Sequence, residues 1–357
     1  MGTCGKRRSS SATALGLATL VVAICGFMLV PAAGQSPRKM PRTADGKPDL
    51  QGTWTNVTIT PIERRDEFPN LVLTEADAAK LEKGVTDRID RLSQPSDPNR
   101  DAPPKGGDGS TGAAGNVGGY NNFWIDSGTR VAIVNGERRS SLIVDPPDGK
   151  VPALTPEARK RNADRFAAFR KGGGEYDHPE FRPLAERCLL SFGSSAGPPM
   201  LPNYFYNNNY QIVQTPDHVM ILVEMVHDAR IVRLNATTHL PKHIRPWMGD
   251  SIGRWEGDTL VVETTNFPPQ QTFRGASENL KVIERFTRAD ADTILYRFTI
   301  EDPTTFTKPF SGEVPFEATD EVIYEYACHE GNYALSNILS GERDREKARA
   351  GTKDQKE

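Results

Sequence analysis

The stretch that decides the fold is residues 252–265, Ile-Gly-Arg-Trp-Glu-Gly-Asp-Thr-Leu-Val-Val-Glu-Thr-Thr. Gly257-Asp258 separates two short runs of strand-forming residues, and a two-residue loop of this kind predicts a β-hairpin. Short runs joined by tight turns recur at 49–54, 210–215, 218–226, 230–234, 280–288, 293–301, 310–316 and 322–328. In the second half of the chain these runs do not alternate with helices, which predicts a mainly β fold, an antiparallel β-barrel or sandwich.

The first half of the chain adds two accessory helices and a loop. Thr74 followed by acidic residues predicts a helix over 74–94, because Thr caps a helix and acids suit its first turn. Thr155-Pro156-Glu157 predicts a second helix over 155–171. Asn135-Gly136 predicts a hairpin between strands at 130–134 and 140–144. Residues 95–119 are rich in Gly, Pro, Asp and Ser and predict a mobile loop.

These elements form one β-rich domain over residues 49–340, preceded by a flexible lead-in at 35–48. We expect a short helix at 333–339, and then a solvated charged tail at 341–357. The 31 glycines and 27 prolines are expected in a protein with many turns.

The N-terminus has the layout of a secretory signal peptide. Lys6, Arg7 and Arg8 precede an uncharged apolar run, and Pro31-Ala-Ala-Gly34 supplies small residues for cleavage. We therefore expect a leader at 1–34 and a periplasmic or extracellular protein, with no membrane span after cleavage. The alternative is an uncleaved anchor, since the run is just long enough to span a bilayer.

The charge and the cysteine count both depend on this leader. It holds three basic and no acidic residues, so its loss changes the formal net charge from −3 to −6. This balance excludes a strongly basic nucleic-acid binder. The leader also removes Cys4 and Cys25, which leaves Cys188 and Cys328 in an oxidising compartment and predicts a disulfide between them. The alternative is a pair of buried thiols.

Three strings resemble a large family of secreted bacterial proteins from soil and aquatic proteobacteria and acidobacteria. They are SLIVDPPDG at 141–149, GRWEGDTLVV at 253–262 and YACHEGNY at 326–333. The resemblance covers nearly the whole mature chain. It implies export and a shared fold, and it carries over no catalytic residue.

The densest polar group in the sequence lies around one strand-to-strand corner and consists of Glu224, His227, Asp228 and Arg230. If a bend near Val226 brings Glu224 onto His227, the carboxylate can orient the imidazole for general base catalysis. His329 and Glu330 follow Cys328, and the disulfide would fix them near Cys188 as a second acid–base pair. The alternative for both histidines is a structural position in a turn.

His239 and His243 have the spacing of a helical metal pair, but Pro241 lies between them. A metal site on extended chain, with His218 or Asp250, is the alternative; we predict no metal site. Ser195 fits Gly-x-Ser-x-Gly, but Pro198-Pro199 follows where a hydrolase elbow requires a helix.

Aromatic and polar side chains offer a ligand site as well as a core. We take Trp247, Trp255, Tyr206, Asn208 and Asp250 as the ligand-binding candidates. Three functions remain open. The first is binding or conversion of a small organic molecule in a cleft of the β-domain, with His acid–base candidates. The others are a non-catalytic envelope or interaction protein and a metal-dependent hydrolase. The sequence names no cofactor.

Overall fold

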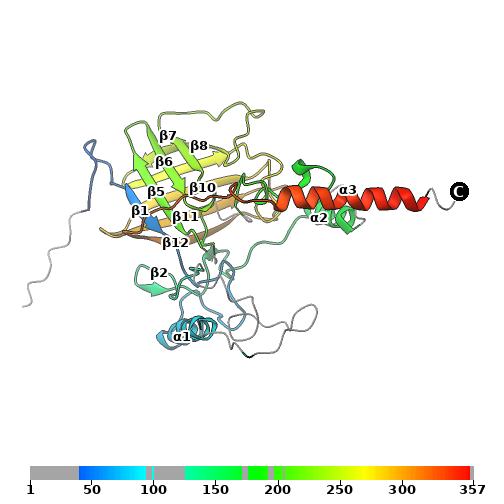
Figure 1. Ribbon diagram of the computed structural model, residues 1–357. Coiled ribbons are helices and arrows are strands. Elements are labelled where there is room, and N and C mark those ends of the chain that lie inside the picture. Colours follow the sequence, from blue (N-terminus) through cyan, green and yellow to red (C-terminus); the bar gives the residue numbers. More distant parts are fainter. Residues whose placement is uncertain are drawn as a thin grey trace, which may run out of the picture. The chain divides into compact units, whose positions relative to one another are not determined.

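The computed structural model describes residues 40–93, 99, 125–170, 176–191, 197–203 and 206–353 (Figure 1). The chain divides into two units, Met1–Arg38 and Lys39–Glu357, and every described residue belongs to the second. The predicted leader, Ser195 and the predicted loop at 95–119, apart from Asn99, lie outside the described residues. Residues 40–48 of the predicted lead-in are anchored to the barrel by an ion pair between Arg42 and Asp258.

Nine strands close into one barrel. Around it the order is β1, β5, β6, β7, β8, β9, β10, β11 and β12, and β12 returns to β1. The predicted barrel is therefore confirmed. The strands are β1 Gly52–Thr55, β5 Asn209–Gln214, β6 His218–Val223, β7 Ala229–Arg233, β8 Asp250–Glu256, β9 Thr259–Thr265, β10 Lys281–Arg288, β11 Thr293–Glu301 and β12 Phe310–Ala318.

The barrel is mixed, so the prediction of a purely antiparallel sheet was wrong in one place. β7 and β8 run parallel, while every other neighbouring pair in the ring is antiparallel. The cause is parity, because strand directions cannot alternate around a closed ring of nine. Parallel neighbours need a long crossover, and residues 234–249 supply it. We call this pairing the parallel step.

The barrel interior is filled by alternate side chains of its strands. Tyr296 lies 5.1 Å, between ring centroids, from both Phe286 and Phe316, and Tyr210 lies 5.2 Å from Phe316. All four rings are fully buried. The centre of this domain is therefore a packed aromatic core, and any ligand site has to be sought on its walls and ends.

β12 is shared between three neighbours. One edge pairs with β11 over its length, while the other pairs with β4 (Ile143–Asp145) at Ser311 and Gly312 and with β1 at Glu317 and Ala318. Pro315 falls in the gap between those two pairings, where its missing N–H leaves no ladder bond unmade. The β1–β12 junction closes the barrel, and we call it the closure seam.

Smaller elements surround the barrel. The predicted Asn135-Gly136 hairpin is present, with both residues at positive φ, but its strands β2 (Ile133–Val134) and β3 (Glu137–Arg138) are short. The predicted strand at 322–328 is not found, since residues 319–328 have no regular secondary structure. Two short 3-10 helices, η3 (Pro179–Phe181) and η4 (Met225–His227), complete the described elements.

The described residues include three α-helices, two at the predicted accessory positions and one where a short helix was expected. Helices α1 (Glu75–Leu92) and α2 (Pro156–Arg170) match the predictions, and the Thr74 hydroxyl caps α1 by accepting a hydrogen bond from the Asp77 N–H. The third, α3 (Ala334–Lys353), extends the short predicted helix through most of the expected tail. No described helix is both long and apolar enough to cross a membrane.

Candidate functional site

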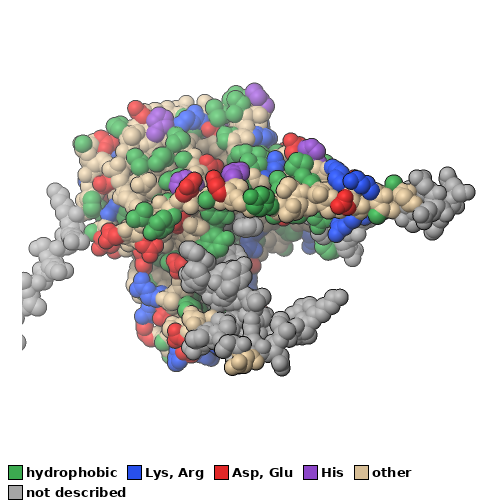
Figure 2. All heavy atoms as spheres, in the orientation of Figure 1, with side chains coloured by type: hydrophobic (Ala, Val, Ile, Leu, Met, Phe, Trp, Pro, Cys, Tyr) green, Lys and Arg blue, Asp and Glu red, His purple; other side chains and the backbone are tan. Residues whose placement is uncertain are grey.

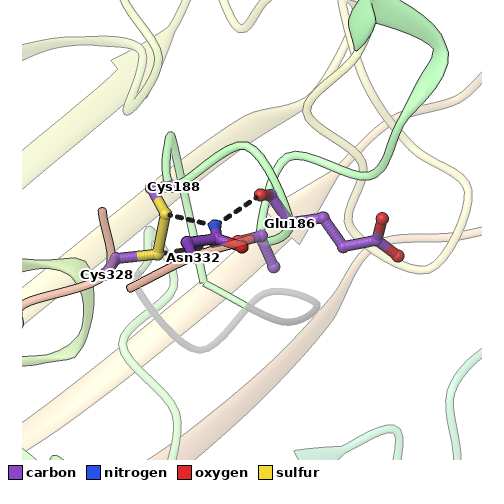
Figure 3. Close-up of a disulfide and its surroundings, with 5 residues drawn as sticks. Glu186, Cys188, Cys328 and Asn332 are labelled. Carbon is purple, nitrogen blue, oxygen red and sulfur yellow. Dashed lines mark hydrogen bonds between the residues drawn. A yellow bond between two sulfur atoms is a disulfide. The ribbon is translucent and has the colours of Figure 1, made fainter. Parts of the chain in front are cut away.

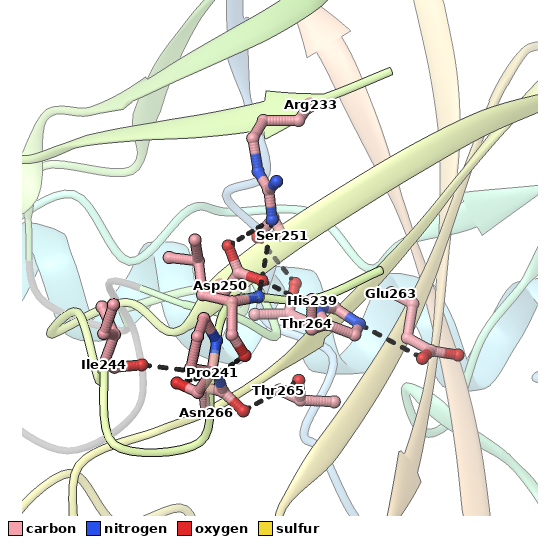
Figure 4. Close-up of polar contacts among 11 residues, drawn as sticks. Arg233, His239, Pro241, Ile244, Asp250, Ser251, Glu263, Thr264, Thr265 and Asn266 are labelled. Atoms are coloured by element: carbon pink, nitrogen blue, oxygen red, sulfur yellow. Dashed lines mark hydrogen bonds and ion pairs between the residues drawn. The ribbon is translucent and has the colours of Figure 1, made fainter. Parts of the chain in front are cut away.

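A histidine held between two carboxylates lies at the parallel step. His239 belongs to the 234–249 crossover, Asp250 opens β8 and Glu263 lies on β9. The His239 Nδ1 is 2.8 Å from Asp250 Oδ2, and its Nε2 is 3.3 Å from Glu263 Oε1 (Figure 4). Three segments that are separate in sequence therefore fix one imidazole.

Asp250 is saturated with hydrogen-bond donors. Besides His239, it accepts the Leu240 N–H at 2.9 Å and the Arg233 guanidinium at 2.9 and 3.0 Å. Burial alone would raise the pKa of this carboxyl, but the hydrogen bonds from Leu240, His239 and Arg233 outweigh it and hold the pKa below its usual value. Asp250 is thus a fixed carboxylate that orients His239.

The crossover itself is held to the barrel by neutral contacts. The Asn266 amide donates to the carbonyl oxygens of Leu240 at 2.9 Å and of Pro241 and Ile244 at 3.4 Å. Gly249 ends the crossover at φ 73°, where an added Cβ would lie 2.7 Å from Thr265 O. Only glycine fits this turn without strain, so the backbone around His239 has little freedom.

Glu263 continues a line of charges along the outer wall of the barrel. It lies 3.6 Å from Lys281 Nζ, which is 2.9 Å from Glu301. A neutral imidazole has one N–H and cannot donate to two carboxylates, so the protonated ring of His239 is the form that satisfies both contacts.

The sequence named Asp250 and Trp247 as ligand candidates, and it set Asp250 beside His239 and His243 only in the metal-site alternative. It did not find Glu263. Trp247 is partly buried and packs against the barrel core, and His243 is exposed. Glu263 stands on an outward-facing strand position, where an acid is ordinary, so its meeting with His239 carries no local signal.

The bend proposed near Val226 is present, but it does not join the predicted acid–base pair. Val226 and His227 have φ of 70° and 61°. Glu224 is 4% exposed and accepts the Asn209 N–H at 3.2 Å, while the His227 side chain is exposed. Among the described residues, the His227 imidazole has no hydrogen bond or ion pair.

Glu224 lies beneath the segment 319–333. Burial raises the pKa of its carboxyl, and Glu321 of that segment raises it further, against hydrogen bonds from Asn209, Asn207 and the Tyr324 backbone. Burial likewise raises the pKa of the neighbouring Asp228. The corner therefore holds a buried carboxyl that takes up a proton more readily than an exposed one.

Arg230 faces the barrel interior, away from the surface where His227 lies. It forms a two-pronged ion pair with Glu284, and both side chains are almost fully buried. Tyr296 donates to Glu284 at 2.9 Å and accepts the Met200 N–H at 2.9 Å. This pair belongs to the barrel core, and the structure does not bring Arg230 together with His227 or His329.

The predicted disulfide between Cys188 and Cys328 is present, with Cα atoms 5.7 Å apart (Figure 3). The Asn332 amide donates to the Glu186 carbonyl at 3.3 Å and approaches Cys188 Sγ at 3.5 Å. The bond attaches the segment 319–333 to the chain that precedes β5. His329 and Glu330 follow it directly and are exposed.

The remaining predicted ligand residues lie in separate places. Asn208 is 2% exposed, and it accepts the Asn203 N–H and donates to the Asp126 carbonyl, so it supports a loop. Tyr206 hydrogen-bonds Tyr326. Trp255 is partly buried, with Lys47 Nζ 5.9 Å from its ring centroid. Figure 2 likewise shows histidines at several separate places on the face in view.

A groove of about 390 Å³ lies at the closure seam, and none of the predicted site residues lines it. Its floor includes Trp54 and Arg288, with the guanidinium 4.8 Å from the indole centroid. Its outer wall is the start of the segment 319–333, including Asp320 and Glu321. We call it the seam groove.

One group of three metal-ligand side chains occurs in the described part of the chain, namely Asp177, Glu342 and Glu346. Glu342 already pairs with Arg345 and Arg349 at 3.3 Å each. No histidine belongs to the group, so it gives no support to a metal site built on His239 and His243.

Comparison of the chain with protein-family models and with curated proteins finds no match. The functional argument therefore rests on the geometry of the seam groove and of the His239 cluster.

Proposed function

We propose that the protein binds a small organic molecule in the seam groove. The observation that carries the proposal is the groove itself: its volume of about 390 Å³ falls within the roughly 300–1,000 Å³ of typical ligand pockets. It is formed where two strands and an irregular segment meet, which leaves a hollow beside the packed core.

The polar groups of the groove indicate the kind of ligand. Arg288 donates its N–H groups to the carbonyls of Asp49, Asp290 and Ala291, so it is committed to holding the floor. Asp320 has no hydrogen bond or ion pair among the described residues, and Glu321 accepts one bond, from Asn209 at 3.3 Å. Free carboxylate oxygens favour a ligand that presents amine or hydroxyl groups.

The groove adjoins the buried carboxyl of Glu224. Asn209 bonds Glu321 through its side chain and Glu224 through its backbone N–H. One residue thus separates the groove wall from a carboxyl whose pKa is raised by burial, as is common for groups that transfer protons. This proximity supports conversion of the bound molecule as the extension of the same proposal.

The disulfide supports the proposed export, because such bonds persist in oxidising compartments. A periplasmic or extracellular protein that binds a small molecule is the function that these observations favour together.

The proposal is tested by thermal-shift screening of the purified protein against sets of amines, polyols and carboxylates. Amines or polyols that raise the melting temperature of the wild type should have no effect on the double variant Asp320→Asn/Glu321→Gln. Glu325→Gln is the matched control, since Glu325 is exposed in the same segment and does not line the groove. Equal shifts in the double variant and the control would exclude the groove as the binding site.

A further inference from the structure

We propose that His239 is the acid–base group of a second site, on the outer wall at the parallel step, which takes a proton from water or from a hydroxyl group of a small substrate. This site shares no residue with the seam groove. The inference therefore stands or falls independently of the proposed function.

The first support is the fixed orientation of the ring. Asp250 binds Nδ1 at 2.8 Å and is itself held by Arg233 and the Leu240 N–H. A carboxylate on Nδ1 selects the tautomer whose Nε2 carries the lone pair, and it stabilises the cation formed on protonation. The reacting atom is therefore Nε2.

The second support is that the His239 contacts are not the crossover's sole attachment to the barrel. The Asn266 amide, the Gly249 turn and a 2.6 Å hydrogen bond from Arg245 to the Phe267 carbonyl attach it as well. The His239 side chain is also 19% exposed, so part of it is in contact with solvent.

In the resting state of the site, the Glu263 carboxylate is the partner of His239 Nε2. Its contact with Nε2 at 3.3 Å is longer than the Asp250 contact, and its side chain is 31% exposed and also near Lys281. The charged groups facing the ring are thus Asp250 and Glu263, with Arg233 and Lys281 behind them. In this state Nε2 carries a proton and donates it to Glu263. Once that proton has left to solvent and Glu263 has turned towards Lys281, Nε2 is free to accept another.

The proton-transfer step follows from this geometry. An O–H bond of water or substrate breaks, its proton bonds to Nε2, and the oxygen keeps the electron pair for attack on an electrophilic carbon. The same proton then returns from Nε2 to the leaving oxygen. With an ester the products are a carboxylic acid and an alcohol, and no other reactant is consumed.

The first test is chemical modification with diethyl pyrocarbonate, which acylates unprotonated imidazoles. Glu263→Gln removes the negative charge beside Nε2 and leaves a weaker amide acceptor, so His239 should be modified severalfold faster than in the wild type. His243, exposed four residues along the same crossover, should react equally in both proteins. Mass spectrometry of the peptides distinguishes the two histidines, and an unchanged His239 rate would overturn the proposal.

The second test measures hydrolysis of p-nitrophenyl acetate, with folding checked by circular dichroism. His239→Gln and Asp250→Asn should each lower the rate at least about tenfold, as expected for loss of a positioned base or its tautomer. His243→Gln is the control and should retain the wild-type rate. A wild-type rate in His239→Gln contradicts the proposal, and this variant decides the question if Asp250→Asn does not fold.

Discussion

The closure seam and the parallel step are the two places where the barrel ladder is shortest. Each has two registered residue pairs, Trp54↔Ala318 and Thr55↔Glu317 at the seam and Val232↔Ser251 and Arg233↔Ile252 at the step. Other neighbours in the ring share four to eight pairs. Both proposed sites lie at these short ladders, because irregular chain has to approach the wall where strands part.

The closure seam and the parallel step are covered by different kinds of chain segment, held in different ways. At the seam an irregular segment, attached through a disulfide, forms one wall of an open groove. At the step a crossover covers the junction and is held by side-chain amides and ion pairs. The seam therefore suits binding, since it leaves an open volume, whereas the step suits precise placement of one side chain.

The largest expected effect concerns the covalent attachment at the seam. Replacing Cys188 and Cys328 together by serine should lower the free energy of unfolding by about 4–5 kcal/mol, because the bond closes a loop with a sequence separation of 140. Urea unfolding measures it, and reduced wild-type protein should match the variant. If the loss is below about 1 kcal/mol, the bond does little to restrict the unfolded chain. Its main effect is then to restrain the wall of the groove in the folded protein.

The next effect concerns the turn at the step. Gly249→Ala should lower the free energy of unfolding by about 3 kcal/mol. The alanine strains the backbone at positive φ, and its Cβ lies 2.7 Å from both Thr264 and Thr265. Gly257→Ala is the matched control: Gly257 also has positive φ but nothing within 4 Å of its Cβ, so we expect about 1 kcal/mol. Equal losses in urea unfolding would mean that the crossover is not tightly packed.

The smallest effect is a pH dependence of the stability, caused by Asp250 at the parallel step. The lowered pKa of Asp250 means that its carboxylate stabilises the fold above the unfolded-state value of about 3.9, and that this stability is lost as the pH falls through the folded-state pKa. Asp250→Asn should therefore lower the free energy of unfolding by about 2 kcal/mol at pH 7. The two proteins should converge at the acid end of a pH series of unfolding curves. A difference that persists there would assign the loss to packing.

The local pattern of the chain predicted the strands, the hairpin turn at Gly257-Asp258 and the first two helices, because side-chain period and capping are local properties. Strand direction at the step could not be predicted this way, since it depends on how many strands close the ring. The expected strand at 322–328 failed for a related reason: with β1 already paired to β12, the ring had no free edge to receive it.

The candidate sites were predicted less well, because they depend on contacts between distant residues. Arg230 was placed with His227 by proximity in sequence. Its partner Glu284, between the inward-facing Val282 and Phe286, shows by alternation alone that an acid lies inside the barrel. The alternation along β10 is thus a local signal for this buried ion pair. The contacts of His239 with Asp250 and Glu263 depend on the path of the crossover, which no local pattern sets.

The sharing of β12 between β4 and β1 has a consequence for the behaviour of the protein in concentrated solution. Each of the nine ring strands has a neighbour on both sides, so no ring strand of the described barrel has a wholly unpaired side. The outer side of the added strand β4 is covered in part, because the Ile143 N–H donates to the Ile62 carbonyl. This strand has three residues and is followed by Pro146 and Pro147. Short, proline-ended edges resist intermolecular β-pairing, so this fold is protected against aggregation through its strands.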